Sequence, residues 1–394
     1  MSVPSDDLAF LCQGSEKVLN QEELKTKLDS GRPLRVKLGV DPTAPDIHLG
    51  HAVVLSKLRD FQDKGHEAIL IIGDFTAMIG DPSGRSVTRP QLTHDQVLEN
   101  AKSYQEQAFK ILSRERVKIV FNGEWFEAMS FEEVIKLNSR VTLQQMLVRE
   151  DFRERLDKGL PIHAHEIQYP IMQGWDSVMI KSDVELGGTD QLFNIMVGRD
   201  LQKAEGLPQQ VAMVMPILEG LDGKQKMSKS LGNYVALNEA PGDMFGKLMS
   251  ISDELMVRYY SALLHETLPA DIHPMEAKKT LAQRITARFH SEGEAEAARR
   301  NFETRFSKKN LDEAELPDFF ARDCPRDFIS LIVNAFAQCF QITKSRGDVR
   351  RLIEGGSVRW CGEKVADVKA ELPEGSEGVL KLDKTHAVRV KVQA

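Results

Sequence analysis

The chain has few cysteines and no long apolar segment. Its 394 residues include four scattered cysteines without a C-x-x-C pair, at positions Cys12, Cys324, Cys339 and Cys361. This spacing excludes a disulfide scaffold and a cysteine-based zinc site, and it is typical of reduced thiols. No run of about 18 apolar residues occurs, so we expect no membrane-spanning helix. The first residues lack the basic and apolar regions of an export signal, which predicts a cytoplasmic protein.

The chain also lacks an excess of positive charge. It has 52 Lys and Arg against 59 Asp and Glu, a formal net charge of −7, which argues against a protein that coats nucleic acid through bulk charge. The charge is uneven, however, because residues 341–394 contain 11 basic and 8 acidic groups. The length predicts two or three globular domains.

Short apolar runs alternate with amphipathic helical stretches in the first two thirds of the chain. The runs that we interpret as strands are residues 35–40, 68–72, 117–121 and 211–215. Two capping boxes, Thr93 with Gln96 and Ser130 with Glu133, predict helix starts between them. This alternation predicts an α/β fold with a doubly wound parallel sheet, in which ligands bind beyond the carboxyl ends of the strands.

The pattern changes twice toward the carboxyl end, which predicts three domains. Residues 1–232 form the α/β domain, and residues 233–335 form an all-α domain with no strand expected between 244 and 340. Residues 336–394 form a small α+β module with a basic helix over 344–353 and short strands near 358–360, 379–382 and 388–392.

The first chemical motif follows the first predicted strand and opens a helix. His48 and His51 flank a Leu-Gly pair, where helix N–H groups already favour anions, so they are suited to donate hydrogen bonds to phosphate oxygens. Gly50 has no side chain and leaves room for a flat base against the backbone. The alternative is a surface helix start with two incidental histidines.

The second motif is a glycine-flanked loop at residues 222–232, with closely spaced lysines and hydroxyls. Lys226 and Lys229 could stabilise the charge that develops on a triphosphate during in-line displacement. The alternative is a solvated basic loop. The chain has no G-x-x-x-x-G-K-[ST] sequence and is therefore not a P-loop protein.

A third group of polar residues lies on one predicted helix and the turn that follows. Tyr169, Gln173 and Asp176 stand at i, i+4 and i+7, so they share one helix face that suits a polar pocket wall. Beyond the next strand, Asp190 and Gln191 follow a Gly-Gly turn and are suited to ribose hydroxyls and an ammonium group. The alternative is a solvated polar face.

The two motifs resemble the HIGH and KMSKS signatures of class I aminoacyl-tRNA synthetases, with Leu49 in place of the usual isoleucine. With the third group, essentially the whole chain resembles the bacterial tyrosyl-tRNA synthetases. The resemblance implies a Rossmann-type catalytic domain, a helical anticodon-binding domain and an S4-type RNA-binding domain. It also implies that L-tyrosine reacts with ATP, accompanied by Mg²⁺, to form tyrosyl-AMP and pyrophosphate, and that tyrosine is then transferred to the 3′-terminal adenosine of tRNA(Tyr). We expect no metal site formed by the protein itself.

The resemblance assigns roles residue by residue. The groups that it implies for transition-state stabilisation and pyrophosphate are Thr43, His48, His51, Arg85, Arg89, Lys226 and Lys229. Those that it implies for ATP are Gly39, Asp41, His48, Gly50, His51, Gly188, Asp190, Met227 and Lys229. Those that it implies for tyrosine are Lys37, Thr76, Asp81, Tyr169, Gln173, Asp176 and Gln191.

The chain departs from the family at one position. Many bacterial members have a tyrosine as the second partner of the substrate phenol, where this chain has Lys37, and a lysine could hydrogen-bond the phenol directly or through water. Asp176 resembles the residue that accepts the phenol proton. Phenylalanine would leave this carboxylate desolvated and unpaired, an effect for which synthetases of this specificity are the standard example.

The carboxyl-terminal module carries the fourth signal. The residues that resemble an RNA-binding surface, and that would contact phosphates in a salt-dependent way, are Lys344, Arg346, Arg350 and Arg351. The alternative is a solvated charged helix. The resemblance further implies a homodimer built near an insertion at about residues 125–165.

Two rival interpretations remain open. A tryptophanyl-tRNA synthetase would share the fold, but Gln173 with Asp176 favours a phenol pocket over an indole pocket. A non-catalytic RNA-binding protein on a retired scaffold would be expected to have lost some of the motif residues. His163 and His165 could suggest a metal site, but no third ligand accompanies them in the sequence, so we interpret both histidines as loop residues.

Overall fold

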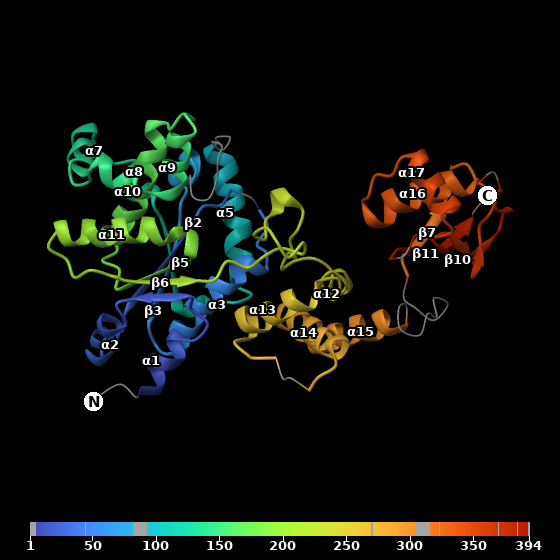
Figure 1. Cartoon of the computed structure of the whole chain (residues 1–394), viewed down its shortest axis with the longest axis horizontal. Helices are drawn as coiled ribbons and strands as arrows, with labels where there is room; N and C mark the ends of the chain where they lie inside the picture. The colour runs from blue at the N-terminus through green and yellow to red at the C-terminus, as the bar shows by residue number, and fades with distance from the viewer. Residues whose placement is uncertain are drawn as a thin grey trace. The chain divides into compact units, whose positions relative to one another are not determined.

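The structure is a computed structural model that describes residues 5–43, 45–81, 93–268, 271–304, 316–322, 324–368, 370–383 and 385–392. The chain divides into two compact units, Met1–Ala295 and Glu296–Ala394, which are described separately (Figure 1). No helix in these described ranges is long and apolar enough to cross a membrane.

The first unit is built on a six-stranded sheet. Its strands are β1 (Lys17–Leu19), β2 (Arg35–Val40), β3 (Glu67–Ile72), β4 (Val117–Phe121), β5 (Val184–Gly188) and β6 (Val211–Met215). Their order is β1-β6-β5-β2-β3-β4, and all neighbours are parallel except β1 and β6. The four predicted strands are confirmed, whereas β1 was not predicted. Strands β3 and β4 lie on one side of β2, and β5 and β6 lie on the other. The strand order therefore reverses between β2 and β5, which is where doubly wound sheets bind ligands.

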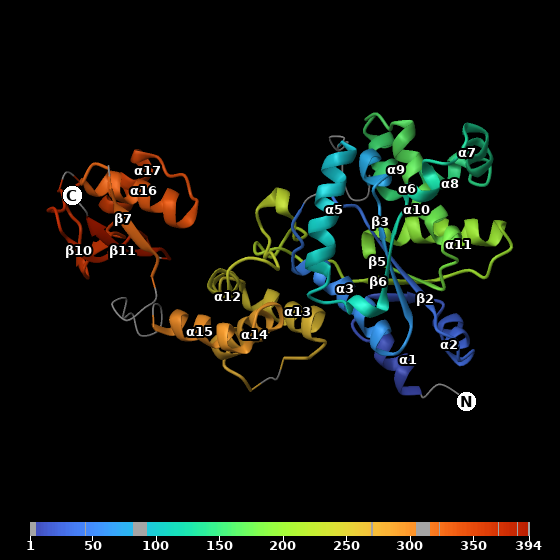
Figure 2. The same cartoon turned by 180° about the vertical axis from the view of Figure 1, so that it is seen from behind.

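Helices connect these strands and extend the unit. They are α1 (Ser5–Cys12), α2 (Gln21–Asp29), α3 (Leu49–Asp63), α4 (Thr76–Ile79), α5 (His94–Ala108), α6 (Gly123–Phe126), α7 (Phe131–Asn138), α8 (Leu143–Leu147), α9 (Glu150–Asp157), α10 (Ala164–Met179), α11 (Leu192–Ala204), α12 (Pro241–Met249), α13 (Asp253–Leu264) and α14 (Pro274–Phe289). Helix α3 packs against β2, β3 and β5, while α10 and α11 lie side by side (Figures 1 and 2).

Both predicted capping boxes are present. The Thr93 hydroxyl accepts the N–H of Gln96 at 3.3 Å, and the Gln96 side chain accepts the N–H of Thr93 at 3.0 Å. Ser130 and Glu133 exchange the same pair of bonds at the start of α7. These bonds satisfy N–H groups that a helix start leaves without partners, which explains why α5 and α7 begin where they do.

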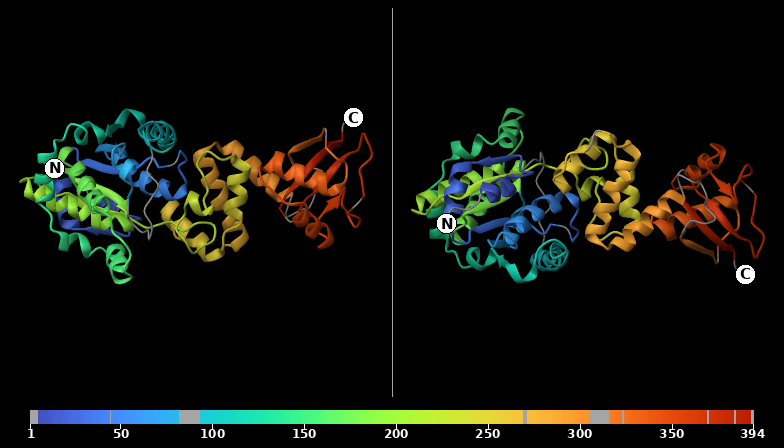
Figure 3. Two further views of the ribbon diagram at one scale, coloured as in Figure 1. Left: turned by 90° about the horizontal axis from the view of Figure 1, so that it is seen from above. Right: turned by 90° about the horizontal axis from the view of Figure 1, so that it is seen from below.

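The second unit combines a five-stranded sheet with two helices. The strands β7 (Asp318–Ala321), β8 (Arg359–Trp360), β9 (Glu363–Lys364), β10 (Glu377–Lys381) and β11 (Ala387–Val392) have the order β7-β11-β10-β8-β9. Helices α16 (Phe328–Phe340) and α17 (Arg346–Glu354) share its hydrophobic core, and Figure 3 shows these orange helices against the red strands. Helix α15 (Glu292–Phe302) crosses the boundary between the two units.

Two expectations for this region were wrong in detail. A strand, β7, lies within residues 244–340, because Phe319 and Ala321 alternate with exposed neighbours and β7 pairs with β11. Helix α17 begins at Arg346, since Ser345 caps it, so Lys344 precedes the basic helix instead of belonging to it. Residues 335 and 336 both lie in α16, and the expected division into three domains stays a prediction.

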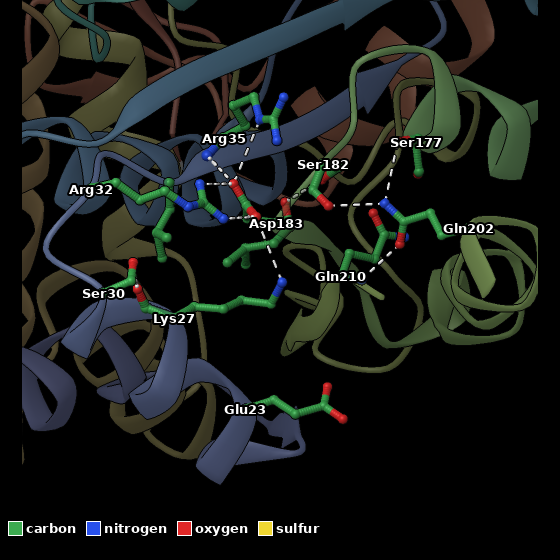
Figure 4. Close-up of polar contacts among 12 residues, drawn as sticks. Glu23, Lys27, Ser30, Arg32, Arg35, Ser177, Ser182, Asp183, Gln202 and Gln210 are labelled. Carbon is green, nitrogen blue, oxygen red and sulfur yellow. Dashed lines mark hydrogen bonds and ion pairs between the residues drawn. The ribbon is translucent and has the colours of Figure 1, made fainter. Parts of the chain in front are cut away.

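A charged cluster closes the amino end of the central strands. Asp183, directly before β5, accepts two hydrogen bonds from Arg32 at 2.6 and 2.8 Å and one from the N–H of Arg35 at 3.0 Å (Figure 4). Lys27 lies 3.6 Å away. Burial raises the pKa of Asp183, but these donors outweigh it and hold the pKa at about 2. The cluster therefore joins α2, β2 and β5 at the end of the sheet opposite to the predicted ligand-binding edge.

Candidate active site

The two signature motifs meet at the carboxyl edge of the sheet. His48 caps α3, and the chain after the lysine loop pairs with it through an antiparallel bridge between His48 and Ala236. The N–H of Leu49 donates to the carbonyl of Val235 at 3.0 Å, and the N–H of Leu237 donates to that of Ile47 at 2.9 Å. These bonds hold the segment that follows the lysine loop beside the start of α3.

The two histidines are partly buried and lie against each other. Their ring centroids are 3.9 Å apart, and Nδ1 of His51 accepts the backbone N–H of His48 at 3.3 Å. Burial lowers the pKa of His48 to about 2, aided by His51 and Lys226, and burial lowers the pKa of His51 to about 4. Both imidazoles are therefore neutral at pH 7. Nδ1 of His48 is buried and has no hydrogen-bond partner among the described residues.

The two lysines of the second motif bridge to the other side of the cleft. Lys226 Nζ lies 3.3 Å from Asp190 Oδ2, and Lys229 Nζ lies 2.6 Å from Asp46 Oδ2. Both ammonium groups are partly exposed. Asn233 shapes the loop, because its side chain accepts the N–H of Ser228 at 2.8 Å and donates to the carbonyl of Lys226 at 3.2 Å.

The glycines of the site leave room where a side chain would obstruct. A Cβ on Gly50 would lie 3.0 Å from the His48 ring and 3.7 Å from Met227 Cβ, and a Cβ on Gly188 would lie 2.7 Å from Asp190 Oδ1. Gly39 is exposed in the last part of β2, with open space where its Cβ would be. The backbone can thus approach a flat ligand closely at these three points.

The predicted polar face of α10 is present and leads into a hydrogen-bond network. Tyr169 donates to Asp41 Oδ2 at 2.8 Å, and Thr76 donates to Asp41 Oδ1 at 2.8 Å. Thr76 in turn accepts from Asn122 Nδ2 at 3.0 Å. The carboxyl ends of β2, β3 and β4 are thus tied to α10.

A second branch of the network reaches the turn after β5. Gln191 donates to Asp81 Oδ2 at 2.8 Å, and Asn194 Nδ2 donates to Gln191 at 3.2 Å and to Gln173 Oε1 at 2.8 Å. The two branches together contain five of the seven residues predicted for tyrosine, namely Thr76, Tyr169, Gln173, Asp81 and Gln191.

Asp176 is the most perturbed acid of this region. It is 3% exposed, and its carboxylate accepts from Trp125 Nε1 at 3.1 Å and from Asn122 Nδ2 at 3.4 Å. Burial raises the pKa of Asp176 to about 7, although the Lys37 charge and the two donors lower it. A perturbed carboxyl group in a pocket wall is typical of a functional site.

Lys37 lies fully buried beneath this wall. Its ammonium donates to the carbonyl oxygen of Gln173 and to Ser177 Oγ, each at 2.8 Å, and it forms an ion pair with Glu185 Oε1 at 2.8 Å. The lysine is therefore near the predicted phenol site but is already surrounded by acceptors.

Several residues of the network were not predicted. Asn122 and Trp125 follow β4 at the same edge as the other site residues, and the Asn-Gly stop after that strand was the available signal. Glu185 is a charged residue inside an otherwise apolar strand, which was a second signal. Asn194 lies on α11 and had no signal, because only the fold brings it beside Gln173.

The remaining predicted residues lie in the turn after β2, outside the described residues, or in the second unit. Thr43 lies in the tight turn after β2, where its N–H donates to the Asp41 carbonyl at 2.7 Å. Arg85 and Arg89 lie outside the described residues. In the second unit, Arg350 and Arg351 are exposed on α17, Arg346 donates to Ser330 at 2.8 Å, and Lys344 lies over the Phe336 ring at 5.6 Å.

A cavity of about 810 Å³ opens beside the turn that carries Asp190. Arg149 and Asp151 line it and form an ion pair at 2.8 Å, and Arg149 also donates to Asn194 at 3.1 Å. Burial raises the pKa of Asp151. No group of three or more potential metal ligands is found among the described residues.

Comparison with known proteins agrees with this geometry. The family model "tRNA synthetases class I (W and Y)" matches residues 29–307. The chain is 48% identical to a tyrosine–tRNA ligase of Oleidesulfovibrio alaskensis, over 98% of each chain, and 47% identical to one of Aquifex aeolicus, over 98% of this chain and 99% of that one. The crystal structure of an Archaeoglobus fulgidus tyrosyl-tRNA synthetase with L-tyrosine superposes with a TM-score of 0.61 at 22% identity, covering 74% of this chain and 99% of that one.

Proposed function

The chain belongs to the class I tRNA synthetases of the tryptophan and tyrosine family, and we infer that it activates L-tyrosine with ATP and transfers it to tRNA. The observation that carries the choice of tyrosine is Asp176, a buried carboxylate held by Trp125 and Asn122 at the end of a polar helix face. A phenol supplies a further hydrogen-bond donor to this carboxylate, which neither phenylalanine nor the hydrocarbon edge of an indole can do.

We propose that the substrate lies along the face of α10. Its phenol donates to Asp176, and its ammonium group is held by Tyr169, Gln173 and Asp81, with Thr76 and Gln191 beside them. Asp81 and Asp41 supply negative charge near the ammonium, and the amides orient it. The arrangement leaves the substrate carboxylate directed toward the histidines and the lysine loop.

Activation is an in-line displacement. A carboxylate oxygen of tyrosine attacks the α-phosphorus of ATP, and the bond from this phosphorus to the bridging oxygen breaks, so that pyrophosphate leaves with the electron pair. Neutral His48 and His51 donate N–H groups to phosphate oxygens, together with the Thr43 hydroxyl. Lys226 and Lys229 leave their carboxylate partners, Asp190 and Asp46, and bind the leaving pyrophosphate. This electrostatic stabilisation of the transition state accounts for most of the catalytic effect. Arg85 and Arg89 are proposed to bind pyrophosphate as well.

The adenosine part of ATP is proposed to lie over the glycines. Gly39 and Gly50 leave space for the base and sugar, Met227 and Asp41 border them, and Asp190 after Gly188 accepts from the ribose hydroxyls. The ion Mg²⁺ accompanies ATP as part of the nucleotide substrate. In the second step a ribose hydroxyl of the 3′-terminal adenosine attacks the tyrosyl carbonyl carbon and AMP leaves.

We further propose the partners and the setting of the enzyme. Arg350, Arg351, Arg346 and Lys344 contact phosphates of tRNA(Tyr), and residues 233–335 bind the anticodon region. Exposed apolar side chains at residues 131–160 support a homodimer, because Phe131 is 79% exposed, and Ile135, Leu143 and Val148 are each more than half exposed. The relatives are bacterial enzymes, and we propose a cytoplasmic location.

The exchange of radioactive pyrophosphate into ATP, measured with each of the twenty amino acids, tests the function. Tyrosine should support exchange at least a hundredfold better than tryptophan or phenylalanine. Stronger exchange with tryptophan would assign the chain to the other branch of the family, and exchange with no amino acid would support a retired, RNA-binding scaffold.

A further inference from the structure

The buried pair of Lys37 and Glu185 is the feature of the tyrosine pocket that the reaction does not explain. Lys37 is in the middle of β2 and Glu185 is its in-register neighbour on β5. Their side chains are 0% and 1% exposed, and the ion pair measures 2.8 Å. Burying two charges costs free energy, so a buried ion pair contributes little net stability to the fold. We therefore expect Lys37 and Glu185 to have another role.

The hydrogen bonds of the lysine are fully committed. A lysine ammonium has three N–H donors, and Lys37 has three acceptors at 2.8 Å, namely the Gln173 carbonyl, Ser177 Oγ and Glu185 Oε1. A phenol would have to displace one of these buried bonds to be contacted directly.

The carboxylate of Glu185 is satisfied as completely. Oε1 also accepts from Gln173 Nε2 at 3.3 Å, and Oε2 accepts from Ser177 Oγ at 3.0 Å and from Gln210 Nε2. The pair therefore holds both the backbone and the side chain of Gln173, and it holds Ser177 one residue beyond Asp176.

We propose that Lys37 is a positioning residue and not a phenol ligand: with Glu185 it fixes residues 173–177 of α10, so that Asp176 alone among the charged groups contacts the substrate phenol. This inference rests on the proposed tyrosine pocket and deepens it. It explains how a chain without the family's tyrosine at this position can still discriminate tyrosine from phenylalanine.

The pair also acts on Asp176 through charge, with opposite signs. The Lys37 charge lowers the pKa of Asp176, and the Glu185 charge raises it. Other titratable groups belong to the hydrogen-bond network around Asn122: Asp41 after β2 accepts from Thr76 and from Tyr169 on α10, and Asp74 after β3 accepts the N–H of Gly123. Asn122 and Trp125 supply its neutral donors.

Three variants test the proposal: Lys37→Met, Glu185→Gln and the double variant. The measurement is kcat/KM for tyrosine and for phenylalanine in ATP–pyrophosphate exchange between pH 5.5 and 9, where the acid limb for tyrosine reports the ionisation of Asp176 in the free enzyme. Lys37→Met should move this limb to higher pH by roughly one unit, and Glu185→Gln should move it to lower pH. The double variant should return toward the wild type.

Lys57→Met is the matched control. Lys57 is also fully buried and paired, with Asp60 at 2.7 Å, but it lies on α3 away from the pocket. This variant should lower the unfolding midpoint and leave the acid limb in place. If Lys37→Met also lowers the unfolding midpoint and leaves the acid limb in place, then Lys37 has a purely structural role and the proposal is wrong.

Other outcomes are equally decisive. If Lys37→Met loses tyrosine activity tenfold or more at every pH, with an unmoved acid limb and unchanged phenylalanine activity, then Lys37 binds the phenol directly and the proposal is wrong. If Lys37→Met does not fold, the shift of Glu185→Gln to lower pH still decides, and its absence refutes the pair. Failure of the wild type to activate tyrosine would instead refute the proposed function.

Discussion

The substitution Asp176→Asn tests the contact that selects the substrate. The side chain is buried, and its two oxygens accept from Trp125 at 3.1 Å and from Asn122 at 3.4 Å. Asparagine has nearly the same volume and keeps one oxygen for Trp125, but it loses the negative charge and one acceptor. The variant therefore changes the chemistry of the pocket without leaving a cavity.

The magnitude follows from the bond that is lost. A hydrogen bond to a charged group contributes about 1.5–3 kcal/mol, and about 1.4 kcal/mol corresponds to a factor of ten. We expect kcat/KM for tyrosine to fall roughly 10- to 100-fold. Phenylalanine should be activated as before or slightly better, because it no longer covers a carboxylate to which it donates no hydrogen bond.

The same substitution should not destabilise the fold. Burial raises the pKa of Asp176 to about 7, against about 3.9 in an unfolded chain. A carboxyl group with a raised folded-state pKa favours the fold below about pH 4, and this contribution is lost as the pH rises to about 7. Asparagine removes that dependence. At pH 8 the unfolding midpoint of the variant should equal or exceed that of the wild type.

The assay is ATP–pyrophosphate exchange with tyrosine and with phenylalanine on the same preparations, beside thermal unfolding at pH 5 and pH 8. A loss confined to tyrosine, in a protein of unchanged stability, supports direct contact with the phenol. Equal losses for both amino acids would refute the reasoning, since they would mean that Asp176 shapes the pocket as a whole.

Three further substitutions test the fold and the partners. Asp183→Asn should lower the free energy of unfolding by about 2 kcal/mol at pH 7, because the folded structure holds the pKa of Asp183 at about 2. Urea titrations should show that this difference between variant and wild type vanishes as the pH falls from about 4 toward 2. A deficit that persisted at pH 2 would contradict an ionic cause. Phe131→Asp should halve the mass measured by analytical ultracentrifugation, whereas the equally apolar, exposed Val257→Asp should not; a monomeric wild type would refute the dimer. Arg350→Glu should raise KM for tRNA about threefold to tenfold with unchanged tyrosine activation, while Lys25→Glu changes neither, and an unaltered KM would remove α17 from the RNA surface.

The sequence predicted the parallel sheet because its strands are buried on both faces and therefore appear as uninterrupted apolar runs, such as residues 68–72. It missed β1 because Lys17–Leu19 is three residues long and contains no such run. It missed β7 for a similar reason, since Asp318–Ala321 is short and lies between helical stretches. Such short strands depend on pairing with a neighbouring strand, here β6 and β11, as well as on their own residues.

The site was predictable where residues of one function stand close together in the chain. Tyr169, Gln173 and Asp176 share a face because helical spacing requires it, and the local sequence contains that information. Asn122 reaches the same pocket from the end of β4, where the Asn-Gly stop was the available signal. Asn194 reaches it from α11, and nothing near it in the sequence indicates this. Their contribution depends on which strands are neighbours.

Lys37 shows how much depends on that neighbourhood. The family resemblance alone suggested that it replaces, at the substrate phenol, the tyrosine of many bacterial members. The register of β2 with β5 places Glu185 directly beside it, 148 positions further along the chain, and the ammonium is then more favourably placed with that carboxylate and the α10 carbonyl than with a neutral hydroxyl. The Lys37 ammonium therefore pairs with Glu185, because leaving this buried carboxylate unpaired would cost several kcal/mol. The role of Lys37 is thus decided by sheet order, and Glu185→Gln, which touches no substrate atom, should reveal it by moving the pH at which tyrosine is recognised.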